Sequence, residues 1–160
     1  MPRIGENVFI AENAVLIGDV TIGDNCSIWY GAVLRGDVGA IKIGNNSNIQ
    51  DNASVHATTD ISEVIIGENV SVGHNAVVHG AIIGNDVLIG MGSVVMDNAT
   101  VPDGTIIAAG AVVLAGSELE PGIYAGVPAK KVKDGSAKIT DSVHKNAVGY
   151  IQYKSWYQDK

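Results

Sequence analysis

Three of the four histidines in this chain lie within a stretch of 24 residues, at positions 56, 74 and 79. Neutral imidazole is a common zinc ligand, and three imidazoles leave a tetrahedral ion one open position for water. A zinc ion held in this way lowers the pKa of that water toward ~7, so hydroxide can form at neutral pH. His56, His74 and His79 are therefore candidate ligands of a catalytic metal, provided that the fold brings them together.

A six-residue repeat determines where these histidines must lie. This period fits neither an amphipathic helix nor a hairpin meander. It is typical of the hexapeptide left-handed parallel β-helix, a three-sided prism with three repeats per coil. A branched apolar residue anchors each repeat inside the prism, and the next residue points outward. The anchors predict an all-β fold of about six coils: Ile4, Ile10, Leu16, Ile22, Ile28, Leu34, Ile43, Ile49, Val55, Ile66, Val72, Val78, Ile83, Ile89, Val95, Val101, Ile107 and Val113.

The repeat also divides the chain into three parts. It predicts a left-handed β-helix domain over residues 1–118 and a connecting segment over 119–135. Longer spacings after Leu34 and Val55 predict two loops that leave the third side of the prism. Residues 136–160 are expected to form a C-terminal α-helix packed along the prism. Its apolar residues recur at four-residue spacing: Ile139, Val143, Ala147 and Ile151.

Residues that directly follow the third-side anchors form one outward column on successive coils. Arg35, His56 and His79 occupy this column, with neighbours about 4.8 Å apart, so the two histidines can share a metal ion. Without a partner, two stacked imidazoles would gain nothing and would repel each other once protonated. His74 lies on a different side, directly above Asp51, and is poorly placed to reach the same ion. A second copy turned about a three-fold axis could present its His74, so the register predicts a metal site between subunits.

Several segments resemble the γ-class carbonic anhydrases and their γ-carbonic-anhydrase-like relatives with hexapeptide repeats. The matching residues are 27–37 (SIWYGAVLRGD), 48–52 (NIQDN) with the following Val55 and His56, and 72–80 (VGHNAVVHG). The segment 124–130 (YAGVPAK) also matches, although many hexapeptide acyltransferases end in the same way. The resemblance covers nearly the whole chain. It implies a homotrimer with three zinc sites at its interfaces.

The resemblance also assigns the histidines to subunits and names polar residues around the metal. It implies that His56 and His79 come from one chain and His74 from the next, in agreement with the register. Gln50 and Asn48 match the residues that orient the reacting water and the substrate in the family.

Four further residues match positions around the family's site. Tyr150, in the expected helix, corresponds to a tyrosine at the edge of the site in relatives. Arg35 and Asp37 match an ion-pair motif of the trimer interface, where Asp51 also lies. For these last three residues the resemblance favours an interface role over direct chemistry.

The implied activity is the reversible hydration of carbon dioxide to bicarbonate, with zinc as the cofactor. Fe²⁺ and Co²⁺ are alternatives, because three imidazoles suit all three metals. The best-known form of the family carries a glutamate directly after Arg-Gly-Asp and another in the loop after the first histidine. Here Val38 takes the first position, and the loop over 57–63 has no glutamate near its start. This departure leaves open a catalytically weak or silent trimer that serves as a metal-binding or assembly module.

A third possibility is a hexapeptide acyltransferase that uses acyl-CoA. Such an enzyme needs one histidine as a general base rather than three in a metal-binding arrangement. It also usually has an insertion that binds the acceptor, and this short chain lacks one.

Composition narrows the expected partners and location. A net charge of −7 argues against nucleic acid as a partner, and no apolar run is long enough to cross a bilayer. The single cysteine, Cys26, cannot form an internal disulfide, and the first residues lack the apolar stretch of a secretory signal. The sequence therefore predicts a cytoplasmic protein whose partners are copies of itself and a small-molecule substrate.

Overall fold

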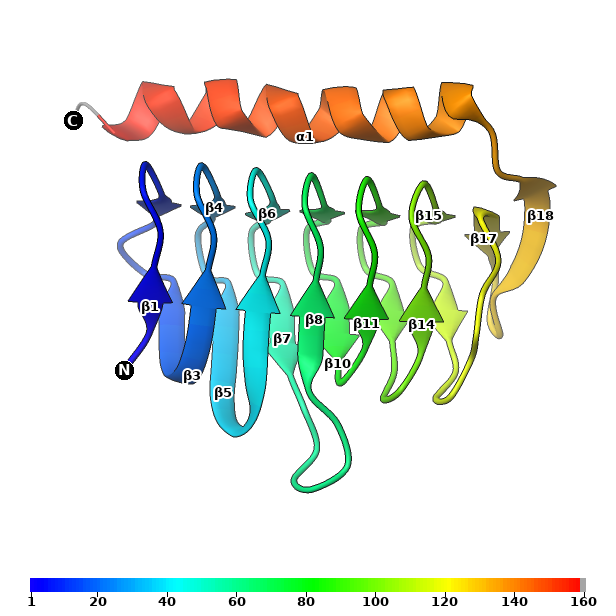
Figure 1. Ribbon diagram of the computed structural model, residues 1–160, viewed down its shortest axis with the longest axis horizontal. Helices are drawn as coiled ribbons and strands as arrows, with labels where there is room; N and C mark the ends of the chain where they lie inside the picture. Colours follow the sequence, from blue (N-terminus) through cyan, green and yellow to red (C-terminus); the bar gives the residue numbers. More distant parts are fainter. Residues whose placement is uncertain (159–160) are drawn as a thin grey trace.

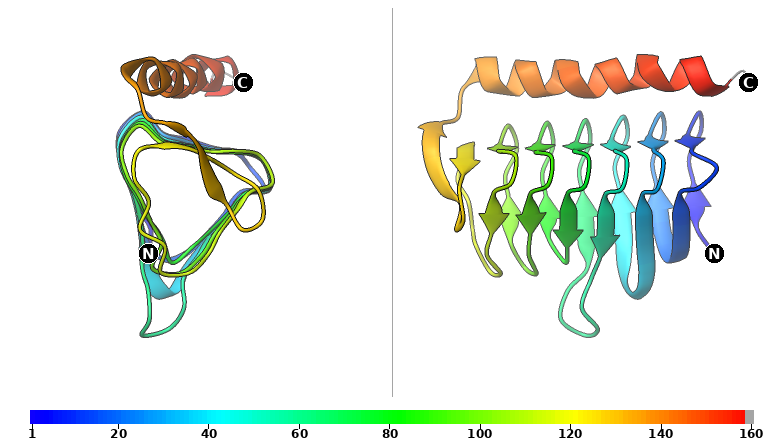
Figure 2. Two further views of the ribbon diagram at one scale, coloured as in Figure 1. Left: turned by 90° about the vertical axis from the view of Figure 1, so that its right-hand side faces the viewer. Right: turned by 180° about the vertical axis from the view of Figure 1, so that it is seen from behind.

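The computed structural model describes residues 1–158, which form a left-handed parallel β-helix with one long helix beside it (Figure 1). Viewed along its axis, the β-helix is a three-sided prism, and the helix runs outside one of its corners (Figure 2). The predicted fold class is therefore confirmed. Short strands stack in parallel on each side of the prism, so neighbouring coils are joined by main-chain hydrogen bonds.

The first side consists of strands that follow the first corner of each coil. It contains β1 (Arg3–Ile4), the end of β3 (Val15–Ile22), the end of β5 (Val33–Ile43), β8 (Val64–Ile66), β11 (Ile82–Ile83) and β14 (Thr100–Val101).

The second side is the one that the helix partly covers. It contains β2 (Phe9–Ile10), β4 (Ser27–Ile28), β6 (Asn48–Ile49), β9 (Ser71–Val72), β12 (Leu88–Ile89), β15 (Ile106–Ile107) and β17 (Gly122–Ala125), with β18 (Lys130–Asp134) antiparallel to β17 at the end.

The third side carries the outward column predicted from the repeat. It contains the beginnings of β3 and β5, followed by β7 (Ser54–His56), β10 (Val77–His79), β13 (Val94–Val95) and β16 (Val112–Val113).

The interior of the prism is filled by the predicted anchors. Every anchor from Ile22 to Val113 is buried, and together they form one continuous apolar core. Ile4 and Ile10 are exposed, because the first coil has no coil beyond it to cover its end. The six-residue spacing therefore predicts which side chains are buried in the interior coils, but it does not do so in the first coil.

Two details differ from the sequence-based expectation. The stack has about seven turns rather than six, because β17 pairs in parallel with β15 and Glu118 bridges to Thr100. The segment expected to be a connection, 119–135, thus holds β17 and β18. The longer spacing after Leu34 is not an irregular loop, since β5 continues through it as one strand paired with β3. Residues 57–63 do leave the prism as a loop (Figure 1).

Helix α1 spans Ala137–Gln158 and lies along the full stack (Figure 2). Ser136 caps its first turn, because Ser136 Oγ accepts the N–H of Ile139 at 3.3 Å. The helix buries Ile139, Val143 and Ala147 against the prism, as the four-residue spacing predicts, whereas the fourth residue of that set, Ile151, is only partly buried. Residues 159 and 160 of the predicted helical segment lie outside the described residues.

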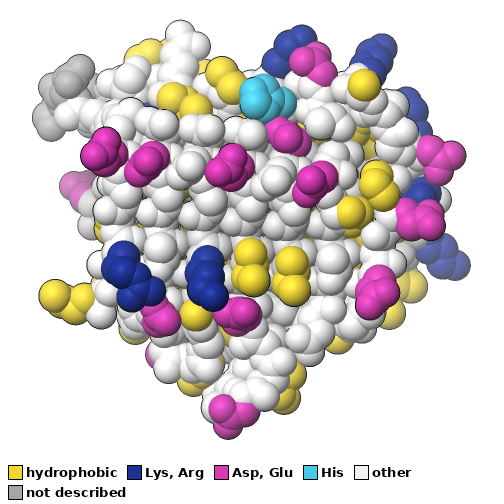
Figure 3. All heavy atoms as spheres, in the orientation of Figure 1, with side chains coloured by type: hydrophobic (Ala, Val, Ile, Leu, Met, Phe, Trp, Pro, Cys, Tyr) yellow, Lys and Arg dark blue, Asp and Glu magenta, His cyan; other side chains and the backbone are white. Residues whose placement is uncertain are grey.

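The surface beside the helix is acidic. A row of acidic side chains runs along the molecule below α1 (Figure 3), in keeping with the net charge of −7. Within residues 1–158, no helix is both long and apolar enough to cross a membrane.

Candidate metal centre

His56 and His79 are neighbours on adjacent coils of the third side. The parallel pairing of β7 with β10 aligns them residue for residue. His56 Nδ1 lies 3.2 Å from His79 Nε2. The predicted column therefore brings two ring nitrogens together at a partly exposed corner of the prism.

Each of these two rings has its other nitrogen beside a carboxylate. His56 Nε2 lies 3.0 Å from Asp37 Oδ1, and His79 Nδ1 lies 3.0 Å from Asp97 Oδ2. A carboxylate only accepts hydrogen bonds, so each imidazole directs its N–H toward the aspartate and keeps a lone pair on the nitrogen that faces the other ring. Two acceptors at 3.2 Å repel each other unless a proton, a metal cation or a neighbouring donor faces their lone pairs.

This separation fits two ligands of one zinc ion. With Zn–N bonds of about 2.0–2.1 Å, two ligands at the tetrahedral angle stand about 3.3 Å apart. Aspartates that hold the remote nitrogen of a histidine ligand are also a regular feature of zinc sites. The donor set of His56 and His79 therefore suits a metal ion that further ligands complete.

Arg35 joins this group through Asp37. Its guanidinium donates to Asp37 Oδ2 at 2.6 Å, and a second nitrogen of the same group lies 3.4 Å from His56 Nδ1. The hydrogen bond from Arg35, with a further contribution from His56, keeps the pKa of Asp37 below its usual value. Asp37 is thus ionised at neutral pH and is able to orient His56.

Asp97 is a residue that sequence reasoning missed. Burial would raise its pKa, but hydrogen bonds from Ser62, His79 and Thr58 outweigh burial and hold the pKa below its usual value. Asp97 lies one position past the outward column, and Ser62 belongs to the loop over 57–63, where no repeat applies. An aspartate next to the column, one coil beyond His79, was the only signal available in the sequence.

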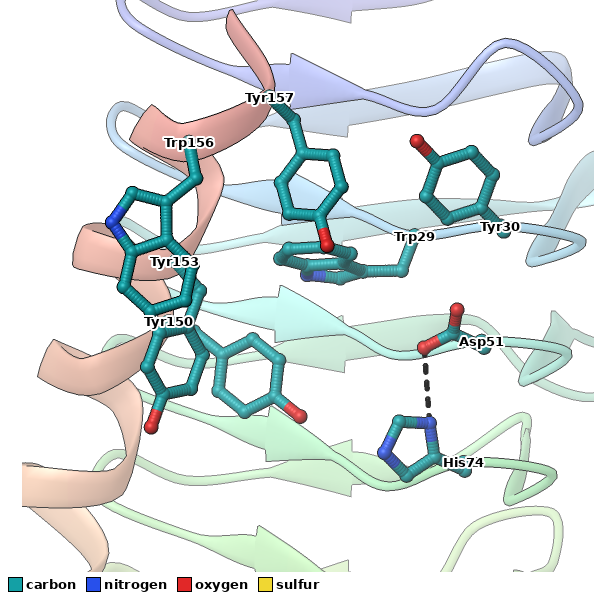
Figure 4. Close-up of a pocket in the computed structure, with 8 residues that line it drawn as sticks. All are labelled: Trp29, Tyr30, Asp51, His74, Tyr150, Tyr153, Trp156 and Tyr157. Carbon is teal, nitrogen blue, oxygen red and sulfur yellow. Dashed lines mark ion pairs between the residues drawn. The ribbon is translucent and has the colours of Figure 1, made fainter.

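His74 lies at a different corner, in the turn between β9 and β10. Its Nδ1 lies 3.0 Å from Asp51 Oδ2, so the same argument leaves the lone pair on Nε2. Both side chains line a hollow of about 280 Å³ whose other walls are the aromatic residues of α1 and of the turn after β4 (Figure 4). Within one chain, His74 therefore does not join His56 and His79.

Gln50 and Asn48 lie on the second side, near His74. Both are buried; Gln50 Nε2 donates to Asn48 Oδ1 at 3.1 Å, and Asn48 Nδ2 donates to Ser71 Oγ at 2.9 Å. These bonds fix the Gln50 amide and leave its carbonyl oxygen available as an acceptor.

Tyr150 of α1 lies beside the same group. Together with Gln50 and His74 it lines a second hollow, of about 380 Å³. Burial, and to a lesser extent the negative charge of Asp51, raises the pKa of Tyr150, so its hydroxyl keeps its proton at neutral pH.

The candidate residues therefore form two separate groups in one chain. Arg35, Asp37, His56 and His79 gather at the third side, whereas Gln50, Asp51, His74 and Tyr150 gather at the second. Within residues 1–158, no three histidine, cysteine or carboxylate side chains lie close enough together to hold a metal.

The fourth histidine provides an internal comparison. His144 Nδ1 lies 2.8 Å from Asp86 Oδ1, so pairing with an aspartate is common to all four histidines. What distinguishes His56 and His79 is the approach of their remaining nitrogens.

Comparisons with known proteins support a family assignment. The family described as bacterial transferase hexapeptide (six repeats) matches residues 1–36 and 80–115, and the one described as hexapeptide repeat of succinyl-transferase matches 63–96. Gamma carbonic anhydrase 2, mitochondrial, from Arabidopsis thaliana is 42% identical over 94% of this chain, which spans only 56% of that relative. The chain thus corresponds to about half of the length of this plant protein.

Two further proteins match over nearly their full length. Protein YrdA of Escherichia coli (strain K12) is 40% identical over 99% of this chain and 90% of its own length. The crystal structure of a hexapeptide transferase family protein from Anaplasma phagocytophilum superposes with a TM-score of 0.92 at 41% identity, covering 98% of this chain and 92% of that one. The repeat, the fold and relatives about 40% identical over most of the chain together show that the chain belongs to the γ-carbonic-anhydrase-like family of hexapeptide-repeat proteins.

Proposed function

We propose that this protein is a zinc-dependent homotrimer that catalyses the reversible hydration of carbon dioxide. In each interface, His56 and His79 of one copy and His74 of the next hold the metal. The observation that carries the proposal is the 3.2 Å separation of two ring nitrogens whose partners on the far side are both carboxylates. The names of the plant relatives support the same activity.

The second group of residues supplies what the first group lacks. Asp51 holds Nδ1 of His74, so Nε2 is the nitrogen that this histidine offers to a neighbouring copy. In a ring of three identical chains, each copy presents one group on either side, and every interface joins the two groups. Three imidazoles from two chains would then hold the metal and leave room for a water molecule beside it.

The residues around the metal would divide the remaining work. Bound zinc supplies Lewis-acid activation of water near neutral pH. The fixed amide of Gln50 offers an acceptor that orients this water, and Asn48 holds Gln50 in place through its own bond to Ser71. Tyr150 borders the same hollow, where it limits the space for the substrate.

One observation favours the second candidate, a weak or silent metal-binding or assembly module. Hydration of carbon dioxide releases a proton that must leave the site, and the two glutamates of the family's best-known form have no counterparts at their positions in this chain. Val38 stands where the best-known relatives carry glutamate, and Glu63 pairs with Lys42 at 3.2 Å. An acyltransferase is the third candidate, supported by the names of the matching family models.

Metal content and carbon dioxide hydration, measured on the purified protein, separate these functions. We expect about one zinc, iron or cobalt ion per chain and hydration that rises with pH through roughly 7. His79→Ala should lose both metal and activity. His144→Ala, which removes a histidine that also pairs with an aspartate, should keep both.

Each alternative has its own outcome in this experiment. Metal at full occupancy without hydration identifies the silent module. Acyl transfer from acyl-CoA without bound metal identifies the acyltransferase. Hydration that survives a chelator, or that is flat with pH, contradicts the zinc mechanism. The cytoplasmic location stays a prediction alongside this function.

A further inference from the structure

Asp97 and Ser62 meet directly above the turn that follows His79. Asp97 follows β13 on the next coil, and the loop over 57–63 brings Ser62 to the same corner. Ser62 Oγ donates to Asp97 Oδ1 at 2.5 Å, and the backbone N–H of Thr58 donates to Ser62 Oγ at 3.0 Å. The loop and the prism are therefore joined at this carboxylate.

Gly80 provides the space for this contact. Its φ is 64°, and a Cβ at this position would collide with both Ser62 Oγ and Asp97 Oδ1. The residue directly after His79 is thus one without a side chain, and the bond between the loop and the prism passes over it. The arrangement is a built feature of this corner rather than a chance contact of two surface residues.

The other oxygen of Asp97 faces His79. Asp97 Oδ2 lies 3.0 Å from His79 Nδ1, and the Asp97 side chain is only 22% exposed. Because a carboxylate accepts and cannot donate, the neutral imidazole of His79 must carry its proton on Nδ1. The lone pair is then on Nε2, the nitrogen that lies 3.2 Å from His56.

We propose that Asp97 and Ser62 are positioning residues that hold His79 in its Nδ1-protonated form with Nε2 directed at the metal. Asp97 acts on the histidine, and Ser62 acts only through Asp97 by fixing the direction of the carboxylate. The metal in this statement rests on the proposed function, whereas the protonation of His79 is a property of the metal-free chain. The loop over 57–63 thereby helps to hold His79, a proposed metal ligand, in position.

The first test uses nitrogen NMR of histidine in the metal-free protein at pH 8. We expect His79 to carry its proton on Nδ1 in the wild type and to become a mixture of both tautomers in Asp97→Ala. His144 serves as the internal reference, because Asp86→Ala should change its tautomer and leave that of His79 unchanged. A wild-type His79 protonated on Nε2, or one that Asp97→Ala does not change, overturns the proposal.

The second test measures zinc affinity by competition with a coloured chelator. Loss of a carboxylate that orients a histidine ligand weakens metal binding by about 10–100-fold, and we expect this for Asp97→Ala. Ser62→Ala should cause a smaller loss that disappears when Asp97 is already alanine. Asp86→Ala should bind zinc as the wild type does. The proposal is overturned if Asp97→Ala binds zinc as tightly as the wild type does. It is also overturned if the Ser62 and Asp97 substitutions change zinc affinity independently of each other.

The two tests separate failure of this inference from failure of the proposed function. A wild type that binds no zinc contradicts the proposed function, and the tautomer of His79 then decides whether Asp97 positions the ring. If the wild type binds zinc and Asp97→Ala binds it with the same affinity, the positioning role of Asp97 is contradicted and the proposed function is not. Thermal unfolding of each variant confirms that it is folded, and Ser62→Ala preserves the test if Asp97→Ala does not fold.

Discussion

Amide side chains have two different roles at the level of single residues. Asn7, Asn25, Asn46 and Asn69 all have positive φ at one corner of the prism, and their side chains form a ladder with contacts of 2.9, 3.3 and 3.2 Å. This ladder provides hydrogen-bond partners for the side-chain amides that stack on successive coils. Gln50 lies outside it, in a hollow beside His74, where an amide has no such structural need.

Gln50→Ala should separate water orientation from metal binding. We expect bound zinc to remain and hydration to fall by about 10–100-fold, because in the proposed site Gln50 would orient the reacting water without being a metal ligand. Metal content and stopped-flow hydration check this outcome. Asn146→Ala, which removes another amide from the wall of the same hollow, is the matched control and should keep its activity. Loss of the trimer in Gln50→Ala would instead make Gln50 an interface residue.

Cys26 gives a prediction about pH and stability. Burial raises the pKa of its thiol to about 11 from a value of 9.0, although Lys154 and two hydrogen bonds act in the opposite direction. The folded state therefore holds this proton more tightly than the unfolded state. The contribution of Cys26 to stability is complete below pH 9.0 and is lost as the pH rises through about 11.

The slope of the unfolding free energy against pH tests this prediction. Between pH 9 and 11 the free energy of unfolding should fall less steeply in Cys26→Ala than in the wild type. Urea unfolding at a series of pH values measures both slopes. Parallel curves for the two proteins would contradict the assignment, whatever the difference in their absolute stability.

Single residues were predicted from the sequence where the repeat fixes their direction. The register placed His79 above His56 and His74 above Asp51, because one-sided burial fixes every second side chain. It placed Asp97 only beside the outward column and did not place Ser62. One lies in a turn beside the column, and the other lies in a loop whose path depends on contacts far apart in the sequence.

At the level of elements, the turns at the corners of the prism have residue preferences as clear as those of the strands. Within residues 1–158, nine residues other than glycine adopt positive φ in the turns, and seven of them are asparagine, which tolerates this conformation better than most residues with a side chain. Gly80 and Gly92 adopt similar positive φ values, of 64° and 66°. They differ in what surrounds them, since Ser62 and Asp97 crowd Gly80 and nothing lies within 4 Å of a Cβ at Gly92.

These two glycines form a matched pair of substitutions. Gly92→Ala should cost only the strain of a left-handed alanine, about 1–2 kcal/mol. Gly80→Ala should cost more, because the added methyl group also separates Ser62 from Asp97. Urea or thermal unfolding of the two variants checks the order. Equal losses would mean that the loop moves away at little cost and that its contact with Asp97 is weak.

The six-residue repeat does not predict the seventh turn, because the interior side chains of that turn differ in spacing and in size. After Val113 the next interior side chains are Leu119 and Tyr124, which are separated by five residues rather than six. A large aromatic ring fills the end of the prism, where no further coil needs to stack above it. The repeat therefore ends in the sequence before the β-helix ends in space.

At the level of the whole molecule, the two groups of site residues face different directions. Among residues 1–158, neither group alone has three histidine, cysteine or carboxylate side chains placed to hold one metal ion. Sequence register could separate the two groups, but it could not predict the surface on which the proposed second copy would dock.

Mixing two inactive variants tests the shared site. His79→Ala and His74→Ala should each lack zinc and activity, since every interface is missing one ligand. In a mixed ring of three, one interface joins an intact His56 and His79 to an intact His74 and regains all three ligands. Unfolding and refolding the variants together should therefore restore part of the metal and the activity. Mixed trimers, verified by mass, that bind no metal would contradict the assignment of His74 to the neighbouring subunit.

The length of helix α1 nearly matches the length of the β-helix beside it. Its 22 residues span about 33 Å, and the six spacings between seven turns span about 29 Å. An additional coil would lengthen the prism by about 4.8 Å, which three helical residues nearly match in length. Three residues also rotate the helix by about 300°, so Ile139, Val143 and Ala147 would no longer align with the later part of the apolar stripe. Insertion or loss of a coil therefore requires a rebuilt helix, and the number of coils is expected to change in evolution only together with the tail.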